Sequence, residues 1–372
     1  MRIGVPKEIK DNEYRVGMTP SSVRELTHHG HQVIVETGAG AGIGMDDGDY
    51  EAAGAAIAPA PAQVFAEAGM IVKVKEPQRG EFPLMRPGQL LFTFLHLAPD
   101  PDQTRALVDR GVIAIAYETV TDAHGRLPLL APMSEVAGRM SIQAGASCLE
   151  KEHGGGGVLL GGAPGVEAAK VVILGGGVVG SNAARMAMGL EAHVTVIDKS
   201  LDRLRELDLL FGSRINALYG TVDTIERQVT EADLVIGAVL APGAAAPVLV
   251  SRQLVARMRP GSVVVDVSID QGGCFETSRP TTHTHPTYVE EGVVHYCVTN
   301  MPGAVARTST FALNNATLPY ICALADKGYK KAMLEDLGLM AGLNVHQGRV
   351  TLAAVARDLG YDWQAPEEAI KN

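Results

Sequence analysis

The chain lacks the features that would indicate a nucleic-acid, membrane or metal-binding protein. Its 372 residues carry 32 Lys and Arg against 42 Asp and Glu, and a formal charge of −10 argues against nucleic acid and anionic membranes as partners. Its four cysteines show no CxxC pair or other metal spacing. The uncharged stretch 234–250 is too short for a membrane span and is interrupted by prolines, and the N-terminus lacks the apolar core of a signal peptide. We therefore expect a cytoplasmic protein with reduced thiols, no bound metal and no membrane segment.

Short apolar runs alternate with helical patterns along most of the chain, which predicts mostly parallel sheets covered by helices on both faces. A long helical pattern over 133–153 separates two series of such runs, and from about Thr308 the pattern becomes helical throughout. We expect an α/β fold with two doubly wound domains and a cleft between them. A discontinuous domain would comprise residues 1–128 and 308–372, and an inserted domain residues 129–307. The predicted strands are 2–5, 33–35, 71–74, 90–95 and 112–116, then 171–174, 194–197, 215–218, 234–238, 263–267 and 294–298.

The glycine-rich stretch VVILGGGVVGSNAARMAMG is the strongest local signal. Gly175, Gly177 and Gly180 form G-x-G-x-x-G directly after a predicted strand and at the start of a predicted helix. This context predicts a turn that lets backbone amides approach a pyrophosphate. Asp198 ends the next strand, where an acid can accept hydrogen bonds from ribose hydroxyls and repel a 2′-phosphate. The pattern therefore favours NAD over NADP, although the glycines alone would also fit a flavin. We expect residues 129–307 to form a Rossmann NAD-binding domain and the discontinuous domain to be the substrate domain.

Four polar residues stand where a dehydrogenase needs a carboxylate clamp and a proton-transfer group. Lys75 and His96 end two predicted parallel strands, so they should project from the same edge of a sheet. Arg15 precedes a helix capped by Thr19, and Asp270 follows the strand VVVDVSI. Each also has a purely structural interpretation: His96 as a satisfied core histidine, the two cations as solvated side chains, and Asp270 as a turn residue.

From one end to the other, the chain resembles alanine dehydrogenases. The resemblance rests on long stretches in matching order, among them KEIKDNEYRV, KVKEP, FTFLHLA, LPLLAPMSEVAGR, VDVSIDQGGCFE and NMPGAVARTSTFALNNATLPY. It implies NAD-linked oxidative deamination of L-alanine to pyruvate and ammonium, the reverse reductive amination, and a homohexamer.

The resemblance also implies roles for individual residues. Arg15 and Lys75 would bind the substrate carboxylate, and His96 and Asp270 would be the catalytic pair. Arg203 stands where the family often has Lys, and Gly220, where it often has Ser, would make only a backbone contact. The implied cofactor contacts besides the three motif glycines are Ser134, Val178, Val179, Asp198, Arg203, Gly220, Val239, Leu240, Val267, Ser268, Ile269, Asp270, Arg279, Val298, Thr299, Asn300 and Met301.

Three other functions share parts of this pattern. One is a dehydrogenase of a bulkier amino acid, of the saccharopine type, and another is a 2-hydroxy-acid dehydrogenase. The third is an NAD(H)-binding subunit like the soluble first domain of proton-pumping transhydrogenase. The combination of Arg15, Lys75 and His96 argues against the third.

Overall fold

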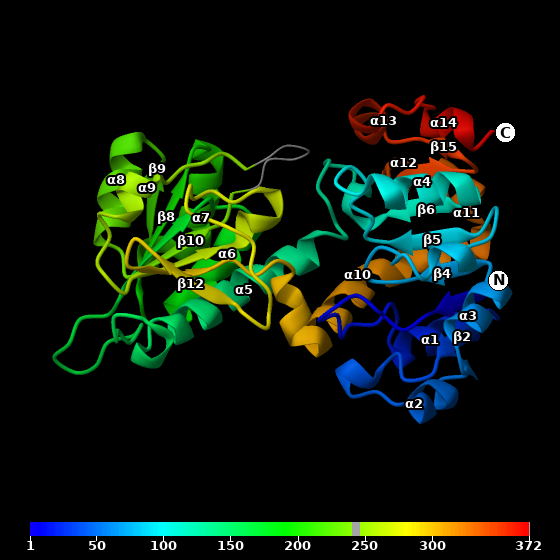
Figure 1. Ribbon diagram of the computed structural model, residues 1–372, viewed down its shortest axis with the longest axis horizontal. Coiled ribbons are helices and arrows are strands. Elements are labelled where there is room, and N and C mark those ends of the chain that lie inside the picture. The colour runs from blue at the N-terminus through cyan, green and yellow to red at the C-terminus, as the bar shows by residue number, and fades with distance from the viewer. Residues whose placement is uncertain (240–245, 372) are drawn as a thin grey trace. The chain divides into compact units, whose positions relative to one another are not determined.

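The computed structural model describes residues 1–239 and 246–371, which form two compact units (Figure 1). Unit 1 comprises Met1–Met133 and Gly303–Asn372, and unit 2 comprises Ser134–Pro302. The chain therefore divides a few residues away from the bounds expected from the sequence. Leu240, an expected cofactor contact, lies outside the described residues.

Unit 1 is built on an eight-stranded sheet in the order β15-β14-β6-β5-β4-β1-β2-β3. The strands β1 to β6 are parallel to one another, and β14 runs antiparallel to both β6 and β15. The strands are β1 (Arg2–Val5), β2 (Gln32–Glu36), β3 (Ala56–Ala58), β4 (Met70–Val72), β5 (Leu90–Thr93), β6 (Ile113–Ala116), β14 (Leu343–His346) and β15 (Arg349–Val350). The helices are α1 (Pro20–His28), α2 (Asp47–Ala52), α3 (Pro61–Glu67), α4 (Pro101–Arg110), α10 (Ala306–Lys327), α11 (Tyr329–Glu335), α12 (Leu337–Ala341), α13 (Ala353–Leu359) and α14 (Pro366–Ala369).

Local sequence signals explain the ends of the helices in unit 1. As predicted, the side chain of Thr19 caps α1 by accepting from the amide of Ser22, and Pro20 occupies the first turn. Gly111 ends α4 in the left-handed conformation, at φ 63°. Each of these two helices returns the chain to the edge of the sheet where the preceding strand began. The next strand therefore runs parallel to the preceding one.

The expectation of a purely helical C-terminal part was wrong, because β14 and β15 lie there. The strand β14 is a run of four buried residues, LNVH, next to the helical segment α12. Its two apolar residues, Leu343 and Val345, are too few to establish a strand period next to a helical segment. The strands β3 and β12 (Thr287–Glu290) were also not predicted, and their burial patterns are mostly intermediate or exposed.

Unit 2 contains a seven-stranded sheet in the order β12-β13-β11-β10-β7-β8-β9. Without the antiparallel edge strand β12, the other six strands, numbered in chain order and read across the sheet from β9, lie in the order 3-2-1-4-5-6. This is the strand order of a dinucleotide-binding domain. The other strands are β7 (Lys170–Leu174), β8 (His193–Asp198), β9 (Asn216–Tyr219), β10 (Leu234–Gly237), β11 (Val263–Asp266) and β13 (Val293–Tyr296). The helices are α5 (Ala131–Cys148), α6 (Val178–Gly189), α7 (Leu201–Phe211), α8 (Val222–Glu231) and α9 (Arg252–Val255).

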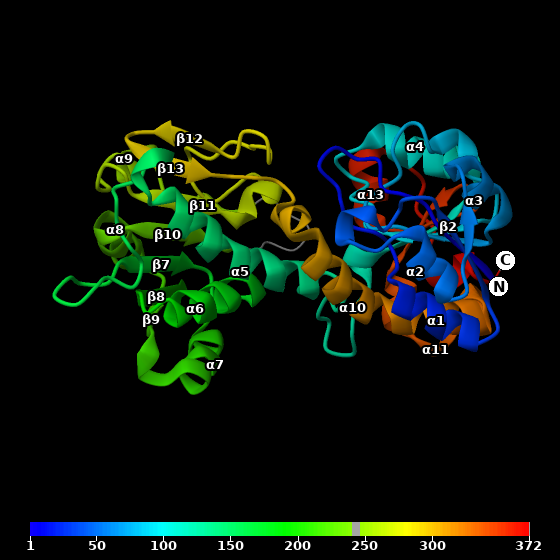
Figure 2. The ribbon, with the colours of Figure 1, turned by 90° about the horizontal axis from the view of Figure 1, so that it is seen from below.

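Helices cover both faces of this sheet, as the buried apolar strands predict. On one face, Val172 and Val235 belong to a core cluster with residues of α8 and α9, such as Val229 and Leu254. On the other face, α6 packs against β7 and β8. Figure 2 shows α5 beside α6, and a Cβ added at Gly138 of α5 would lie 2.2 Å from the carbonyl oxygen of Val179. This arrangement brings the turn between β7 and α6 to the carboxyl edge of the sheet.

Candidate active site

The turn between β7 and α6 has the geometry of a pyrophosphate-binding loop. Gly175 adopts φ 101°, and a Cβ there would lie 2.5 Å from the carbonyl oxygen of Ala238. A Cβ on Gly180 would lie 1.8 Å from the carbonyl oxygen of Gly175, so the helix must approach the strand closely. At Gly177, by contrast, a Cβ would meet no protein atom within 4 Å, and no side chain caps α6 at this residue. The first amides of α6 are therefore available to an anion.

Asp198 and Arg203 both form hydrogen bonds to the backbone of Gly176 in this loop. The Asp198 carboxylate accepts from the amide of Gly176 at 2.7 Å and from the amide of Ser200 at 2.8 Å. The Nε of Arg203 donates to the carbonyl oxygen of Gly176 at 2.5 Å, and its Nη1 lies 2.5 Å from the carboxylate of Glu206. A carboxylate has about four lone-pair sites, so Asp198 can accept ribose hydroxyls while it holds the loop.

Most of the expected cofactor contacts within the described residues lie at or just beyond the carboxyl ends of parallel strands of unit 2. Gly220 follows β9, and its amide donates to the carbonyl oxygen of Asp198 at 2.9 Å. Val239 follows β10, and its carbonyl oxygen accepts from the Ser268 hydroxyl at 2.7 Å. Residues 267–270 follow β11 and residues 298–301 follow β13. Ser134 lies in the first turn of α5, and Arg279 stacks its guanidinium 4.0 Å over the ring of Tyr288.

A buried carboxylate that the sequence analysis missed shapes the turn that carries Asp270. Asp266 is fully buried at the end of β11 and accepts from the amides of Ser268 at 3.0 Å and Cys274 at 2.9 Å. The hydroxyl of Ser278 donates to it at 2.6 Å. Burial raises the pKa of Asp266, and these hydrogen bonds oppose the rise. Asp270 itself is exposed, four residues further on.

In unit 1, Lys75 and His96 follow neighbouring parallel strands, as predicted. The pairing of β4 with β5 continues past their ends, since the amide of Phe94 donates to the carbonyl oxygen of Val74 at 3.2 Å. The Thr93 hydroxyl donates to the carbonyl oxygen of Lys75 at 2.8 Å. Both side chains therefore start from the same, carboxyl, edge of the sheet.

The structure rules out a buried core histidine at position 96. The His96 side chain is 48% exposed, and the residue adopts a left-handed backbone conformation at φ 48°. Its ring stacks parallel to that of Phe94, with 5.9 Å between the centroids. The carboxylate of Glu118, just after β6, accepts from the amides of His96 at 2.7 Å and Leu95 at 3.1 Å. The surroundings therefore hold His96 in a backbone conformation that is uncommon for a non-glycine residue.

Arg15 is more enclosed than its position in the sequence suggested. Its side chain is 2% exposed, and Glu13 binds it through two parallel hydrogen bonds, from Nε at 2.7 Å and from Nη2 at 2.6 Å. Its Nη1 lies 3.0 Å from the sulfur of Met133. The carboxylate of Glu13 fixes the plane of the guanidinium, so a substrate carboxylate would share this cation with Glu13.

The described residues show neither a metal centre nor a membrane span. No group of three or more His, Cys, Asp or Glu side chains within residues 1–239 and 246–371 could hold a metal ion. In the same part of the chain, no helix is long and apolar enough to cross a membrane. All four cysteines are free, and three of them are buried.

Comparisons with known proteins agree with this arrangement. The N-terminal and C-terminal domain models of the alanine dehydrogenase/PNT family match residues 4–137 and 141–353. The chain belongs to the alanine dehydrogenase family. It is 59% identical to the alanine dehydrogenase of Halomonas elongata, over 98% of each chain. It is 56% identical to that of Bacillus subtilis, over 100% of this chain and 98% of the relative.

Solved structures extend the comparison to the fold. A structure of an L-alanine dehydrogenase is 55% identical, superposes with a TM-score of 0.94, and covers 97% of this chain and 99% of its own. A transhydrogenase structure from Sinorhizobium meliloti superposes with a TM-score of 0.80 at 24% identity, over 95% of this chain and 100% of its own. The second likeness shows a shared fold only, so it does not bear on the choice between the two activities.

Proposed function

We propose that this chain catalyses the NAD-dependent oxidative deamination of L-alanine to pyruvate and ammonium, and the reverse reductive amination. Family membership supports a nicotinamide cofactor. The observation that carries the proposal is the pair of strand edges: unit 2 presents a glycine loop with Asp198, and unit 1 presents Lys75 and His96. A transhydrogenase-like binding subunit would need the first edge only.

The cations of unit 1 suit the recognition of a small carboxylate. Arg15 offers a planar guanidinium held in place by Glu13, and Lys75 offers a second positive charge at the end of β4. Together they would orient the Cα of alanine or the carbonyl of pyruvate by binding its carboxylate. Gly175, Gly177 and Asp198 would hold NAD in unit 2, and the bound NAD would supply the acceptor for the hydride from Cα.

His96 and Asp270 would move the protons. His96 would hydrogen-bond the nitrogen or oxygen on the reacting carbon and exchange a proton with it as the amine becomes an iminium. Asp270 would orient the water that attacks the iminium and stabilise its positive charge. The exposure of both side chains is compatible with contact to substrate.

Oxidation of NADH by the purified chain tests this assignment. Turnover with pyruvate that depends on ammonium would support the amino-acid dehydrogenase. Turnover without ammonium would instead indicate a 2-hydroxy-acid dehydrogenase, and no turnover would favour a binding subunit. A panel of larger oxo acids in the same assay would reveal a dehydrogenase of bulkier amino acids.

The preference for NAD over NADP belongs to the same proposal. A 2′-phosphate would lose the hydrogen bonds offered by Asp198 and would meet its charge, which should favour NAD by about tenfold to a few hundredfold. Asp198→Ala should shift the ratio of kcat/KM values toward NADP, with Arg203 as the phosphate partner. Because Glu206 binds Arg203, adding Glu206→Gln should increase the shift. Equal use of both cofactors by the unmodified chain would contradict the role of Asp198.

Assembly as a homohexamer in the cytoplasm completes the proposal. The family resemblance supports the hexamer. The four free cysteines suit a reducing compartment such as the cytoplasm. The mass in solution, measured by light scattering, tests the hexamer: a monomeric mass would contradict it.

A further inference from the structure

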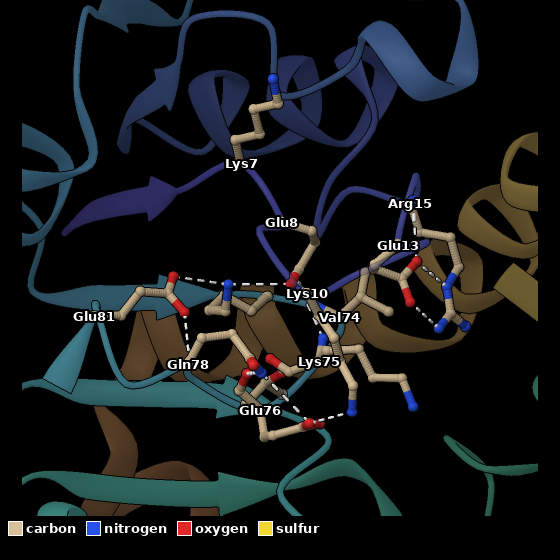
Figure 3. A network of polar contacts seen from close by, with 12 residues as sticks. Lys7, Glu8, Lys10, Glu13, Arg15, Val74, Lys75, Glu76, Gln78 and Glu81 are labelled. Carbon is tan, nitrogen blue, oxygen red and sulfur yellow. Dashed lines mark hydrogen bonds and ion pairs between the residues drawn. The ribbon is translucent and has the colours of Figure 1, made fainter. Parts of the chain in front are cut away.

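Three charged side chains, those of Lys73, Glu8 and Glu81, are buried together next to the end of β4. Figure 3 shows Glu8 and Glu81 within the network of polar contacts around them. Lys73 is fully buried, and its ammonium lies 3.1 Å from the carboxylate of Glu8 and 2.9 Å from that of Glu81. Glu8 is 5% exposed and Glu81 is 2% exposed. Buried ion pairs are seldom more stabilising than apolar side chains of the same volume. The buried ion pairs of Lys73 next to the proposed substrate site therefore suggest a role other than stabilising the fold.

Glu8 reaches in two directions from the loop after β1. One oxygen accepts from Lys73, and the other accepts from the backbone amides of Val74 at 2.6 Å and Lys75 at 3.3 Å. The strands β1 and β4 are neighbours in the sheet, so this loop lies beside the end of β4. Glu8 thus joins the buried ammonium to the backbone from which the Lys75 side chain starts.

The backbone carbonyl oxygens of the segment 73–75 are also hydrogen-bonded. The hydroxyl of Tyr117 donates to the carbonyl oxygen of Lys73 at 3.0 Å, and that of Thr93 donates to the carbonyl oxygen of Lys75 at 2.8 Å. Burial lowers the pKa of Lys73, but the two carboxylates more than reverse this, so its pKa is raised and the ammonium stays charged. The segment 73–75 is therefore fixed at both its amides and its carbonyls.

We propose that Glu8, braced by Lys73, is a positioning residue that sets the place of Lys75 against the substrate carboxylate. This inference rests on the proposed role of Lys75. A lysine is a point charge on a flexible stem, so the position of its backbone limits where the ammonium can reach. A misplacement of about 1 Å in a substrate-binding group can lower the rate about a hundredfold.

Glu81 provides a matched control. It is as buried as Glu8 and contacts the same ammonium, but its second oxygen accepts from the amide of Gln78 at 2.7 Å and not from residues 74 or 75. Glu8→Met and Glu81→Met each leave Lys73 with one carboxylate. The two variants should therefore lose similar thermal stability, while only the first loses the link to Lys75.

The experiment measures the KM for pyruvate at saturating NADH and ammonium, the Kd for NADH by fluorescence, and Tm. Glu8→Met should raise the KM for pyruvate about tenfold to a hundredfold with little change in the Kd for NADH. Glu81→Met, which keeps the hydrogen bonds from the amides of Val74 and Lys75 to Glu8, should leave both within about twofold. Glu8→Gln, which keeps an oxygen acceptor for the amide of Val74, should recover part of the KM.

An unchanged KM in folded Glu8→Met, or an equal rise in Glu81→Met, would overturn the positioning role. If either methionine variant does not fold, Glu8→Gln is compared with Glu81→Gln, and the same two results decide. Lys75→Met separates this inference from the proposed function. If Lys75→Met leaves the KM for pyruvate unchanged, the proposed role of Lys75 fails; if it raises that KM while Glu8→Met does not, only the positioning role fails.

Discussion

Replacing His96 should separate its chemistry from its structural cost. The proposed role is proton exchange with the reacting substrate, and groups of this kind typically contribute about 10²–10⁴-fold to the rate. We therefore expect His96→Gly and His96→Ala both to lose about 10²–10⁴-fold in kcat. The KM for NADH should change little, because His96 belongs to unit 1 and the nucleotide-binding loop to unit 2.

The effect on stability follows from the backbone conformation. At φ 48°, a non-glycine residue carries a strain of about 1–2 kcal/mol, which His96→Gly removes. Glycine costs about 0.5–1 kcal/mol in chain entropy, and the lost stacking on Phe94 costs about 0.5–1.5 kcal/mol. These contributions nearly cancel for His96→Gly. His96→Ala keeps the strain and loses the stacking, so it should be less stable than His96→Gly by up to about 1 kcal/mol.

Steady-state kinetics and thermal denaturation of the three proteins check both parts. A difference of about 1 kcal/mol corresponds to about 2–4 °C in Tm for a domain of 150–250 residues. His96→Gly should then melt within a few degrees of the unmodified chain, and His96→Ala slightly lower. Near-normal turnover in either variant would refute the catalytic role. A large drop in the Tm of His96→Gly would refute the account of strain.

Three further predictions concern other parts of the molecule. Arg15→Lys keeps the charge but loses the paired hydrogen bonds to Glu13, so it should raise the KM for pyruvate about tenfold or more and leave NADH affinity unchanged; the reverse pattern would assign Arg15 to the cofactor or the fold. Asp270→Asn should fold, bind NADH and turn over about a hundredfold more slowly, and normal amination rates would leave Asp270 a turn residue. Burial lowers the pKa of His295 from 6.5, so the unfolded chain gains a proton below about pH 6.5 before the folded chain does, and stability should fall as pH falls toward the folded pKa. His295→Gln should therefore flatten the decline of Tm between about pH 7 and pH 5, and an unchanged slope would contradict this.

Much of the fold could be predicted because its signals are local. The strands β7, β10 and β11 of unit 2 contain uninterrupted runs of Val, Ile and Leu, such as VVIL in β7. The spacing of Gly175, Gly177 and Gly180 predicted the strand–turn–helix geometry, and the contacts of an added Cβ agree with it. Lys75 and His96 could be assigned to one sheet edge because β4 and β5 are successive parallel strands. By contrast, β14 (LNVH) was not predicted, because its two apolar residues, next to a helical segment, are too few to establish a strand period.

The residues that the sequence did not reveal share a physical reason. Glu118 holds the amide of His96 from 22 positions away, and Glu8 holds the amide of Val74 from 66 positions away. Such carboxylates bind backbone amides, which are the same for every residue type, so nothing in the sequence around the partner marks the contact. Asp266 lies nearer to its partners, yet its burial becomes visible only when Ser278 and Cys274 close around it. The side chains proposed to touch substrate were predicted from strand ends and residue type, whereas the carboxylates that hold the backbone beside them could be identified only from coordinates.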